Sequence, residues 1–228
     1  MKWRSLEESN SIDLRPLSEI FAERKALIEK YVPADVRALH KRVVEQLQAE
    51  GIVQRALQTG AKAPGFELKD HTGKTASSTD LLSHGRLVIC FFRGRWDPFC
   101  CGQLEAMNQI VGPIHSSVAG LVAISPQIEQ QAFFMADQHK LKFPLLSDAG
   151  NQVAKKFGLV YHVPAEQQEI YKRVFINLPR VNGDDTWELP IPATYILERD
   201  GTVLYAKANP DYTTRPEPLD VLAALEQS

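Results

Sequence analysis

The chain has 228 residues, 44% of them hydrophobic and 24% charged, with a formal net charge of -2. A chain of this size can bury a core without disulfides or a metal, and its balanced charge argues against nucleic acid or a membrane as partner. The first residues lack the apolar stretch of a signal segment, and no run approaches the about 18 apolar residues of a membrane span. We therefore expect a cytoplasmic protein.

Residues 1–60 are predicted to form a helical extension. Apolar residues recur at three- and four-residue steps over 17–31 and again over 36–47, and Gly51 is a plausible stop for the second helix. Such helices must bury their apolar stripes. They do so either on the rest of the chain or on a second copy, and the second choice predicts a homodimer.

Residues 61–228 are predicted to form one α/β domain in which strands and helices alternate. This alternation favours a mainly parallel sheet, and the Asp200-Gly201 turn predicts a closing hairpin that makes the sheet mixed. In the helix over 127–140 we expect Ile128, Phe133 and Phe134 to face inward, with Met135 as a further candidate. The predicted strands lie at 64–69, 86–92, 120–125, 143–148, 193–197 and 202–206, and the predicted helices at 79–82, 98–111, 127–140, 151–157, after 164, and at 219–225.

The chemistry of the chain is expected in residues 91–101, which read Phe-Phe-Arg-Gly-Arg-Trp-Asp-Pro-Phe-Cys-Cys. This segment leaves the carboxyl end of a central strand, the edge at which sites form in open α/β sheets. Asp97 followed by Pro98 predicts a helix start, with Asp97 as the N-cap. Cys100 then falls in the first helical turn.

A cysteine in a first helical turn is a candidate nucleophile. Free backbone N–H groups and the helix dipole stabilise its thiolate there. Free cysteine has a pKa of about 8.5, and a shift to about 6 would make the thiol mostly ionised at neutral pH. Arg93 and Arg95 either add to this effect, bind an anion or a peroxide oxygen, or are solvated loop charges.

From about Lys62 to Ala224 the sequence resembles the alkyl hydroperoxide reductase and thiol-specific antioxidant group of peroxiredoxins. The resemblance is closest to a branch that carries a helical N-terminal extension and whose site reads Arg-Gly-x-Trp-Cys-Pro-Tyr-Cys. It implies a thioredoxin-like fold with a central mixed β-sheet flanked by helices. The residues that carry it are the segment described above and the ranges 123–126, 143–148 and 192–195.

Two registers of this resemblance compete. Peroxiredoxins typically read Pro-x-x-x-Thr-x-x-Cys, which puts Arg93 at the proline, Asp97 at the threonine and Cys100 at the peroxide-attacking cysteine. Thioredoxins read Cys-x-x-Cys, which puts Asp97 where the attacking cysteine belongs. The first register keeps a nucleophile and the second removes it. The resemblance thus implies a peroxidase with one essential thiol, Cys100.

Asp97 has several interpretations. It is a helix cap with no catalytic role, a carboxylate that raises the pKa of the nearby thiol, or an acceptor for a bound peroxide in place of the family's threonine hydroxyl. A further interpretation is that Asp97 is an engineered replacement of a cysteine, because aspartate roughly imitates an oxidised cysteine.

Other residues of the predicted site are less specific. Trp96 and Phe99 are candidate substrate-binding walls, and Trp96 is equally well ordinary packing. Cys101 is either a packing residue or a resolving thiol that acts through a mixed disulfide. Pro192 matches the proline that precedes the hairpin in a cis bond in thioredoxin folds and faces the active cysteine. The arginine that many peroxiredoxins place near this proline is absent from residues 190–192, so Arg93 or Arg95 would have to replace it.

The leading hypothesis is a thiol peroxidase that reduces hydrogen peroxide or an alkyl hydroperoxide. No cysteine stands five residues after Cys100, where some relatives keep a resolving thiol, so an external thiol or a thioredoxin-like reductant is the expected partner. The six histidines lack metal-ligand spacing, and neither metal nor cofactor is expected. Two alternatives are a non-catalytic or redox-sensing protein disabled by Asp97, and a thiol-disulfide oxidoreductase that uses Cys100 and Cys101.

Overall fold

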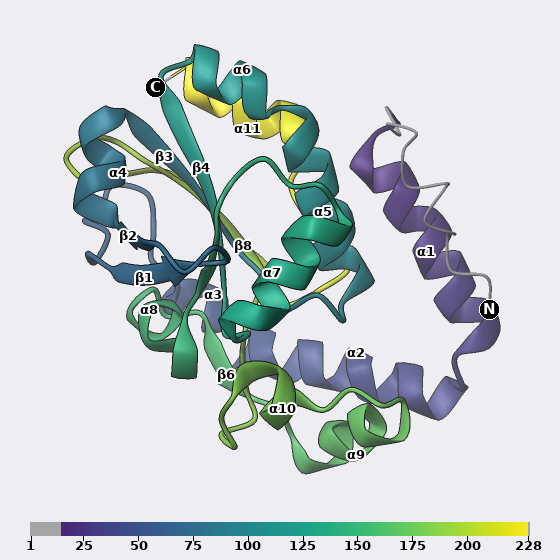
Figure 1. Cartoon of the computed structure of the whole chain (residues 1–228). Coiled ribbons are helices and arrows are strands. Elements are labelled where there is room, and N and C mark those ends of the chain that lie inside the picture. Colours follow the sequence, from purple (N-terminus) through teal and green to yellow (C-terminus); the bar gives the residue numbers. More distant parts are fainter. Residues whose placement is uncertain (1–14, 228) are drawn as a thin grey trace.

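A computed structural model describes residues 15–227 and shows one mixed sheet with helices on both faces (Figure 1). The seven strands of the sheet follow the order β2-β1-β5-β4-β3-β8-β9, and β6 and β7 form a separate pair. The strands are β1 (Glu67–Asp70), β2 (Thr75–Ser77), β3 (Arg86–Phe91), β4 (Ala119–Ser125), β5 (Leu145–Ser147), β6 (Val160–His162), β7 (Glu188–Pro190), β8 (Ala193–Leu197) and β9 (Val203–Ala208).

Helices precede the sheet and connect its strands. They are α1 (Leu17–Tyr31), α2 (Ala34–Ala49), α3 (Ile52–Arg55), α4 (Ser78–His84), α5 (Pro98–Gln109), α6 (Val111–Ser116), α7 (Glu129–Gln138), α8 (Gln152–Lys156), α9 (Ala165–Arg173), α10 (Leu178–Asn182) and α11 (Pro218–Glu226), with a 3₁₀ turn (Ala149–Asn151) before α8.

The pairing of β3 makes the sheet mixed, as the sequence predicts. Strand β3 runs parallel to β4 and antiparallel to β8, and β8 runs antiparallel to β9. Phe91 is opposite Ala193, which is opposite Ala208. Strands β3 and β9 therefore run in the same direction, and the chain leaves both of them at the same edge of the sheet.

The two faces of β3 support two hydrophobic clusters, because successive side chains of a strand point to opposite sides. Leu87 and Ile89 pack in a cluster with residues of α2, α3 and α8. Val88 and Cys90 pack in a cluster with residues of α5, α6, α7 and α11. Because helices cover both faces, β3 reads as a continuous apolar run, and Cys90 is a fully buried core residue.

Three local predictions differ from the structure. The helix expected over 98–111 ends at Gln109, and α6 begins after a break at Ile110. In α7 the residues turned inward are Ala132, Met135 and Ala136, whereas Phe133 and Phe134 are exposed. The β6–β7 pair was not expected. Each strand is only three residues long, too short to show a pattern of its own.

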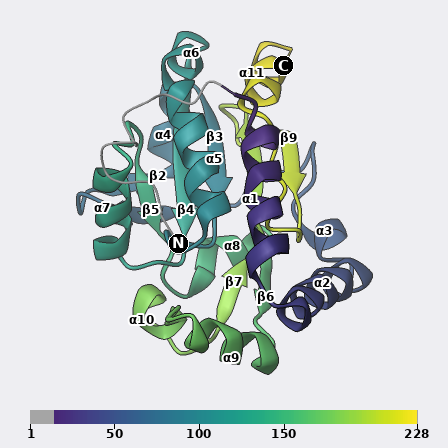
Figure 2. The same cartoon turned by 90° about the vertical axis from the view of Figure 1, so that its right-hand side faces the viewer.

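The N-terminal helices pack on the rest of the chain. Leu39, Val43 and Leu47 of α2 belong to the same hydrophobic cluster as the sheet. Helix α1 lies against α5 (Figure 2), and a Cβ at Gly102 of α5 would collide with the guanidinium of Arg24 on α1. The boundary near residue 60 stays a prediction. Within the described residues, no helix is both long and apolar enough to cross a membrane.

Candidate active site

The loop after β3 presents Cys100 in the first turn of α5. Asp97 is the N-cap, and its Oδ1 accepts a hydrogen bond from the backbone N–H of Phe99 at 2.9 Å, with Pro98 at the first helical position. Gly94 has φ +144°, and a Cβ there would lie 2.7 Å from the indole nitrogen of Trp96. A glycine is therefore needed where the loop folds back on Trp96.

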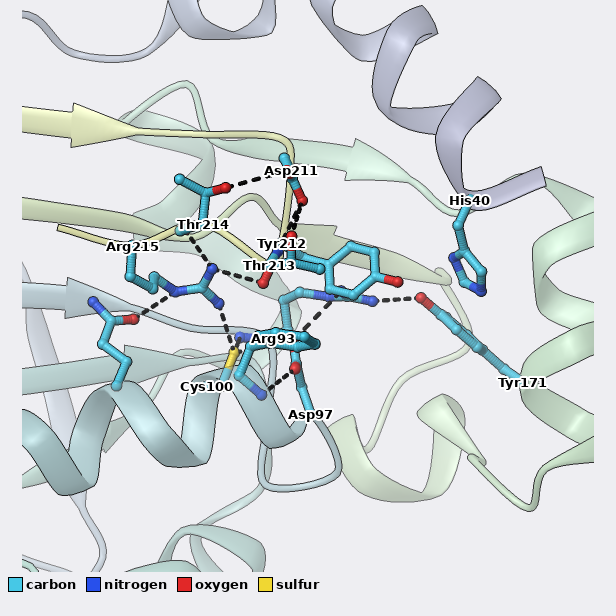
Figure 3. Close-up of polar contacts among 12 residues, drawn as sticks. His40, Arg93, Asp97, Cys100, Tyr171, Asp211, Tyr212, Thr213, Thr214 and Arg215 are labelled. Atoms are coloured by element: carbon cyan, nitrogen blue, oxygen red, sulfur yellow. Dashed lines mark hydrogen bonds and ion pairs between the residues drawn. The ribbon is translucent and has the colours of Figure 1, made fainter. Parts of the chain in front are cut away.

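The thiol of Cys100 is fully buried and has three polar neighbours (Figure 3). Its Sγ donates to Oδ2 of Asp97 at 3.2 Å. It accepts from the backbone N–H of Arg93 at 3.4 Å and from a terminal guanidinium nitrogen of Arg215 at 3.3 Å. One acceptor and two donors thus surround the sulfur, which suits both the loss of its proton and the stabilisation of the resulting charge.

Arg215 corrects the expectation that Arg93 or Arg95 must supply the arginine at the thiol. It comes from the segment that follows β9, and sequence reasoning did not single it out. The predicted hairpin was the sequence signal that could have located this arginine. Its second strand runs parallel to β3, so the residues after Ala208 must lie beside those after Phe91.

Arg93 lies beneath the site as a buried cation, with 2% of its side chain exposed. Its guanidinium lies 3.4 Å from the carboxylate of Asp97 and donates to the hydroxyl of Tyr171. The rings of Trp96 and Tyr212 pack against it at 4.7 and 4.6 Å. Arg93 therefore balances the buried charge of Asp97 from within an aromatic cage.

Arg95 and Cys101 point away from the thiol. The side chain of Arg95 donates to Gln131 at 3.1 Å and packs on Phe134, both on α7. The thiol of Cys101 donates to the backbone carbonyl of Arg95 at 3.3 Å. Within the described residues, neither side chain is hydrogen-bonded to Cys100; for Cys101 the reason is that consecutive positions on a helix face different directions.

The remaining predicted residues have packing roles in the structure. Trp96 stacks on Tyr171 at 5.3 Å as well as on the Arg93 guanidinium. Phe99 is buried against Phe21 of α1. Pro192 is buried directly before β8, and the expectation of a cis bond there is wrong, because no peptide bond in the described residues is cis. The carbonyl of Pro192 accepts a hydrogen bond from the backbone N–H of Asn209, the residue after β9, at 3.1 Å.

The environment of Cys100 does not lower its pKa as the helix position suggested; the structure instead agrees with the alternative in which the Asp97 carboxylate raises it. Burial, followed by the Asp97 carboxylate, raises the pKa of the Cys100 thiol to about 12. The Arg215 and Arg93 side chains and the Arg93 backbone N–H act in the opposite direction. Burial also raises the pKa values of Cys90, to about 12, and of Cys101. At neutral pH the resting Cys100 is therefore a thiol that is hydrogen-bonded to a carboxylate.

Comparison with known proteins places this site in a family. Residues 59–206 match the AhpC/TSA family, which is more than half of the chain. The chain belongs to that family. It is 28% identical over 177 residues to a chloroplastic peroxiredoxin Q of Triticum aestivum, an alignment that covers 78% of this chain and 71% of that protein. It is also 26% identical over 153 residues to a putative peroxiredoxin of Mycobacterium tuberculosis, covering 67% and 86%.

Solved structures share the fold. Peroxidoxin BcpB from Mycobacterium tuberculosis superposes with a TM-score of 0.60 at 23% identity, covering 75% of this chain and 97% of that one. Peroxiredoxin Q of Xanthomonas campestris gives 0.55 at 17% identity, covering 71% and 90%. These structures confirm the predicted thioredoxin-like fold, and the family match with its sequence relatives confirms the prediction of a peroxiredoxin-type thiol peroxidase. The non-catalytic and thiol-disulfide alternatives are not favoured.

Proposed function

We propose that Cys100 is the peroxidatic cysteine of this AhpC/TSA family member and that it reduces hydrogen peroxide or a small alkyl hydroperoxide. The observation that carries the proposal is the set of three contacts on its sulfur. One neighbour, Asp97, takes a proton, and two others, Arg215 and the Arg93 N–H, favour negative charge on sulfur or on a peroxide oxygen. Because the thiol is fully buried, a small peroxide fits this site better than a bulky one.

In the first step the sulfur of Cys100 attacks the terminal oxygen of the peroxide. An S–O bond forms and the O–O bond breaks, so the sulfur is oxidised to a sulfenic acid and the peroxide is reduced to water or an alcohol. The thiol proton passes to the carboxylate of Asp97, 3.2 Å away, and from there to the leaving oxygen. Asp97 therefore has a catalytic role that the threonine hydroxyl of typical relatives cannot fill as a base.

An external thiol regenerates the enzyme in this proposal. It attacks the sulfenic acid and releases water to give a mixed disulfide, and a second thiol then frees Cys100 and leaves as part of an external disulfide. The thiol of Cys101 is bonded to the carbonyl of Arg95 and faces away from Cys100. This placement supports an external reductant, either a small thiol or a thioredoxin-like protein.

The test is to mix the reduced protein with a small excess of hydrogen peroxide and follow its intact mass, beside the Cys100→Ser variant. The expected result is a rapid gain of one oxygen, trapped as a dimedone adduct, in the unmodified chain only. Oxidation no faster than that of free cysteine would contradict the proposal.

A cytoplasmic location and a homodimer stay predictions. Light scattering of the full chain tests the dimer. A mass equal to that of one chain at micromolar concentration would exclude it.

A further inference from the structure

One segment connects the active site to the N-terminal helices. It comprises residues 209–217, which follow β9 and precede α11, and it is called the strap here. The family match covers residues 59–206 and therefore ends before the strap, and it begins after α1, α2 and α3. The contacts between the strap and these helices therefore lie outside the residues that the family match covers.

On its inner side the strap holds the guanidinium of Arg215 in a fixed orientation. Its Nε donates to Oε1 of Gln103 at 2.7 Å, and one terminal nitrogen donates to the backbone carbonyls of Tyr212 and Thr214 at 2.7 and 2.8 Å. The other terminal nitrogen is left for Cys100, as Figure 3 shows. The orientation of Arg215 therefore depends on the conformation of the strap itself.

On its outer side the strap caps helix α1. The two carboxylate oxygens of Glu217 accept the backbone N–H groups of Leu17 and Ser18 at 2.8 and 2.7 Å. Pro16, the residue at the N-cap position, makes no side-chain hydrogen bond to the helix. A helix start needs acceptors for its first N–H groups and favours negative charge, and Glu217 supplies both from 200 residues away.

The middle of the strap lies between the N-terminal helices and the site around Cys100. The ring of Tyr212 packs on the Arg93 guanidinium and lies 5.9 Å from Phe99 of the site helix. It also lies 5.8 Å from the ring of His40 on α2. Phe99 in turn meets Phe21 of α1 edge-on at 5.0 Å. The strap is therefore clamped between the N-terminal helices and the loop that bears the thiol.

We propose that Glu217 is a positioning residue: by capping α1 it fixes the strap so that the guanidinium of Arg215 lies against the thiol of Cys100. The inference rests on the proposed function of Cys100. In this proposal the N-terminal helices affect the chemistry indirectly, because the docking of α1 on Glu217 determines the position of Arg215.

The first test compares Glu217→Ala, Arg215→Ala and the double variant in the full chain. We expect Glu217→Ala to slow the oxidation of Cys100 by hydrogen peroxide about tenfold, since small misplacements of a charged group are costly in rate. The double variant should be no slower than Arg215→Ala alone, because both changes remove the same interaction. Losses that multiply in the double variant would overturn the proposal.

A second readout does not depend on peroxide. The rate at which iodoacetamide alkylates Cys100 reports how readily the thiol ionises. This rate is measured at a series of pH values from the mass of the peptide that contains Cys100. Glu217→Ala should move the alkylation profile to higher pH, as Arg215→Ala does, because Arg215 lowers the pKa of Cys100. An unshifted profile would overturn the positioning role. If peroxide oxidises no form of the protein, the proposed function of Cys100 fails while this profile still decides the role of Glu217.

Two control variants separate positioning from stability. Ser77→Ala removes the side-chain cap of α4, because the Ser77 hydroxyl accepts a hydrogen bond from the backbone N–H of Asp80 at 3.0 Å. Ser77 lies on β2, at the edge of the sheet opposite to β9. We expect it to lower the melting temperature without changing Cys100 oxidation. Glu217→Gln keeps one acceptor oxygen and should recover part of the rate. A loss in Ser77→Ala equal to that in Glu217→Ala would assign the whole effect to stability and overturn the proposal.

Discussion

Asp97 of the loop over residues 93–97 and Arg215 of the strap over residues 209–217 act on the same sulfur in opposite ways. The loop supplies Asp97, which is buried with Arg93 as its counter-charge and which raises the pKa of the Cys100 thiol. The strap supplies Arg215, which is partly exposed and lowers that pKa. Asp97 thus favours the protonated thiol, whereas Arg215 favours the loss of the proton, and the side chain and backbone N–H of Arg93 in the loop act in the same direction as Arg215. The reactivity of Cys100 depends on the balance between two segments far apart in the chain.

The largest expected effect comes from the sulfur that both segments contact. Cys100→Ser should abolish peroxide reduction, because no other described thiol is hydrogen-bonded to Asp97 or Arg215. Cys101→Ser is the matched control and should react at the rate of the unmodified chain, since its thiol faces the Arg95 carbonyl. Peroxide consumption in a stopped-flow instrument measures both. A large loss in the Cys101 variant would mean that the adjacent thiol takes part in the cycle.

The next largest effect is expected when the strap loses its charge. Arg215→Ala should slow Cys100 oxidation by about a hundredfold, the loss typical of removing one preorganised donor from a reacting oxygen. Arg95→Ala is the control, because that arginine contacts Gln131 on α7. Rates under pseudo-first-order peroxide would distinguish the two. Equal losses in both variants would mean that overall positive charge matters more than the strap contact.

Removing the charge from the loop should give a split result. In Asp97→Asn the thiol loses its proton acceptor, which costs about a hundredfold in peroxide reduction. The pKa of Cys100 should fall by about one unit without the neighbouring carboxylate, and this returns about tenfold as thiolate. The net expectation is about tenfold slower peroxide reduction with faster iodoacetamide alkylation. If both reactions became faster, Asp97 would be an inhibitor of Cys100 and not its base.

The last prediction concerns the stability of the fold at acidic pH and not the rate of oxidation of Cys100. Burial, and then the charge of Arg93, lower the pKa of His40 from 6.5 to about 4. In the unfolded chain His40 therefore binds a proton below about pH 6.5, whereas in the folded chain it binds one only below about pH 4. The free energy of unfolding therefore falls as the pH drops from about 6.5 to about 4. The groups that face His40 are Gln167, Tyr171 and Tyr212, together with Arg93.

His40→Gln should remove this dependence, which amounts to about 3 kcal/mol at pH 4. Urea unfolding at pH 7 and pH 4.5 measures it, and the variant should show the smaller difference between the two conditions. A variant that loses as much stability as the unmodified chain would assign the acid sensitivity to the carboxylates instead.

Features set by neighbouring residues could be predicted from the sequence. The continuous apolar run of β3 predicted a central strand, and the Asp97-Pro98 pair predicted the start of α5 and the place of Cys100 in its first turn. These depend on local preferences that a short segment expresses fully. The mixed sheet followed from the alternation of elements and the Asp200-Gly201 turn.

Features set by distant residues could not be predicted with the same success. The ionisation of Cys100 depends on how completely it is buried, and helix position alone gave the wrong direction. The inward face of α7 was assigned only in part: the candidate Met135 is buried, whereas Phe133 and Phe134 are exposed despite their size. Arg215 was missed because it lies in an irregular segment, although the direction of β9 already fixed which edge of the sheet that segment must reach.

The separation between Cys100 and Arg215 has a consequence for the newly made protein. The two residues are 115 positions apart, so at about 5–20 residues per second Cys100 leaves the ribosome's catalytic centre roughly 6–23 seconds before Arg215. During that interval the nascent chain carries the thiol and its aspartate without the arginine. Until Arg215 has been made and has docked, Cys100 lacks the guanidinium contact whose loss we expect to slow its oxidation about a hundredfold.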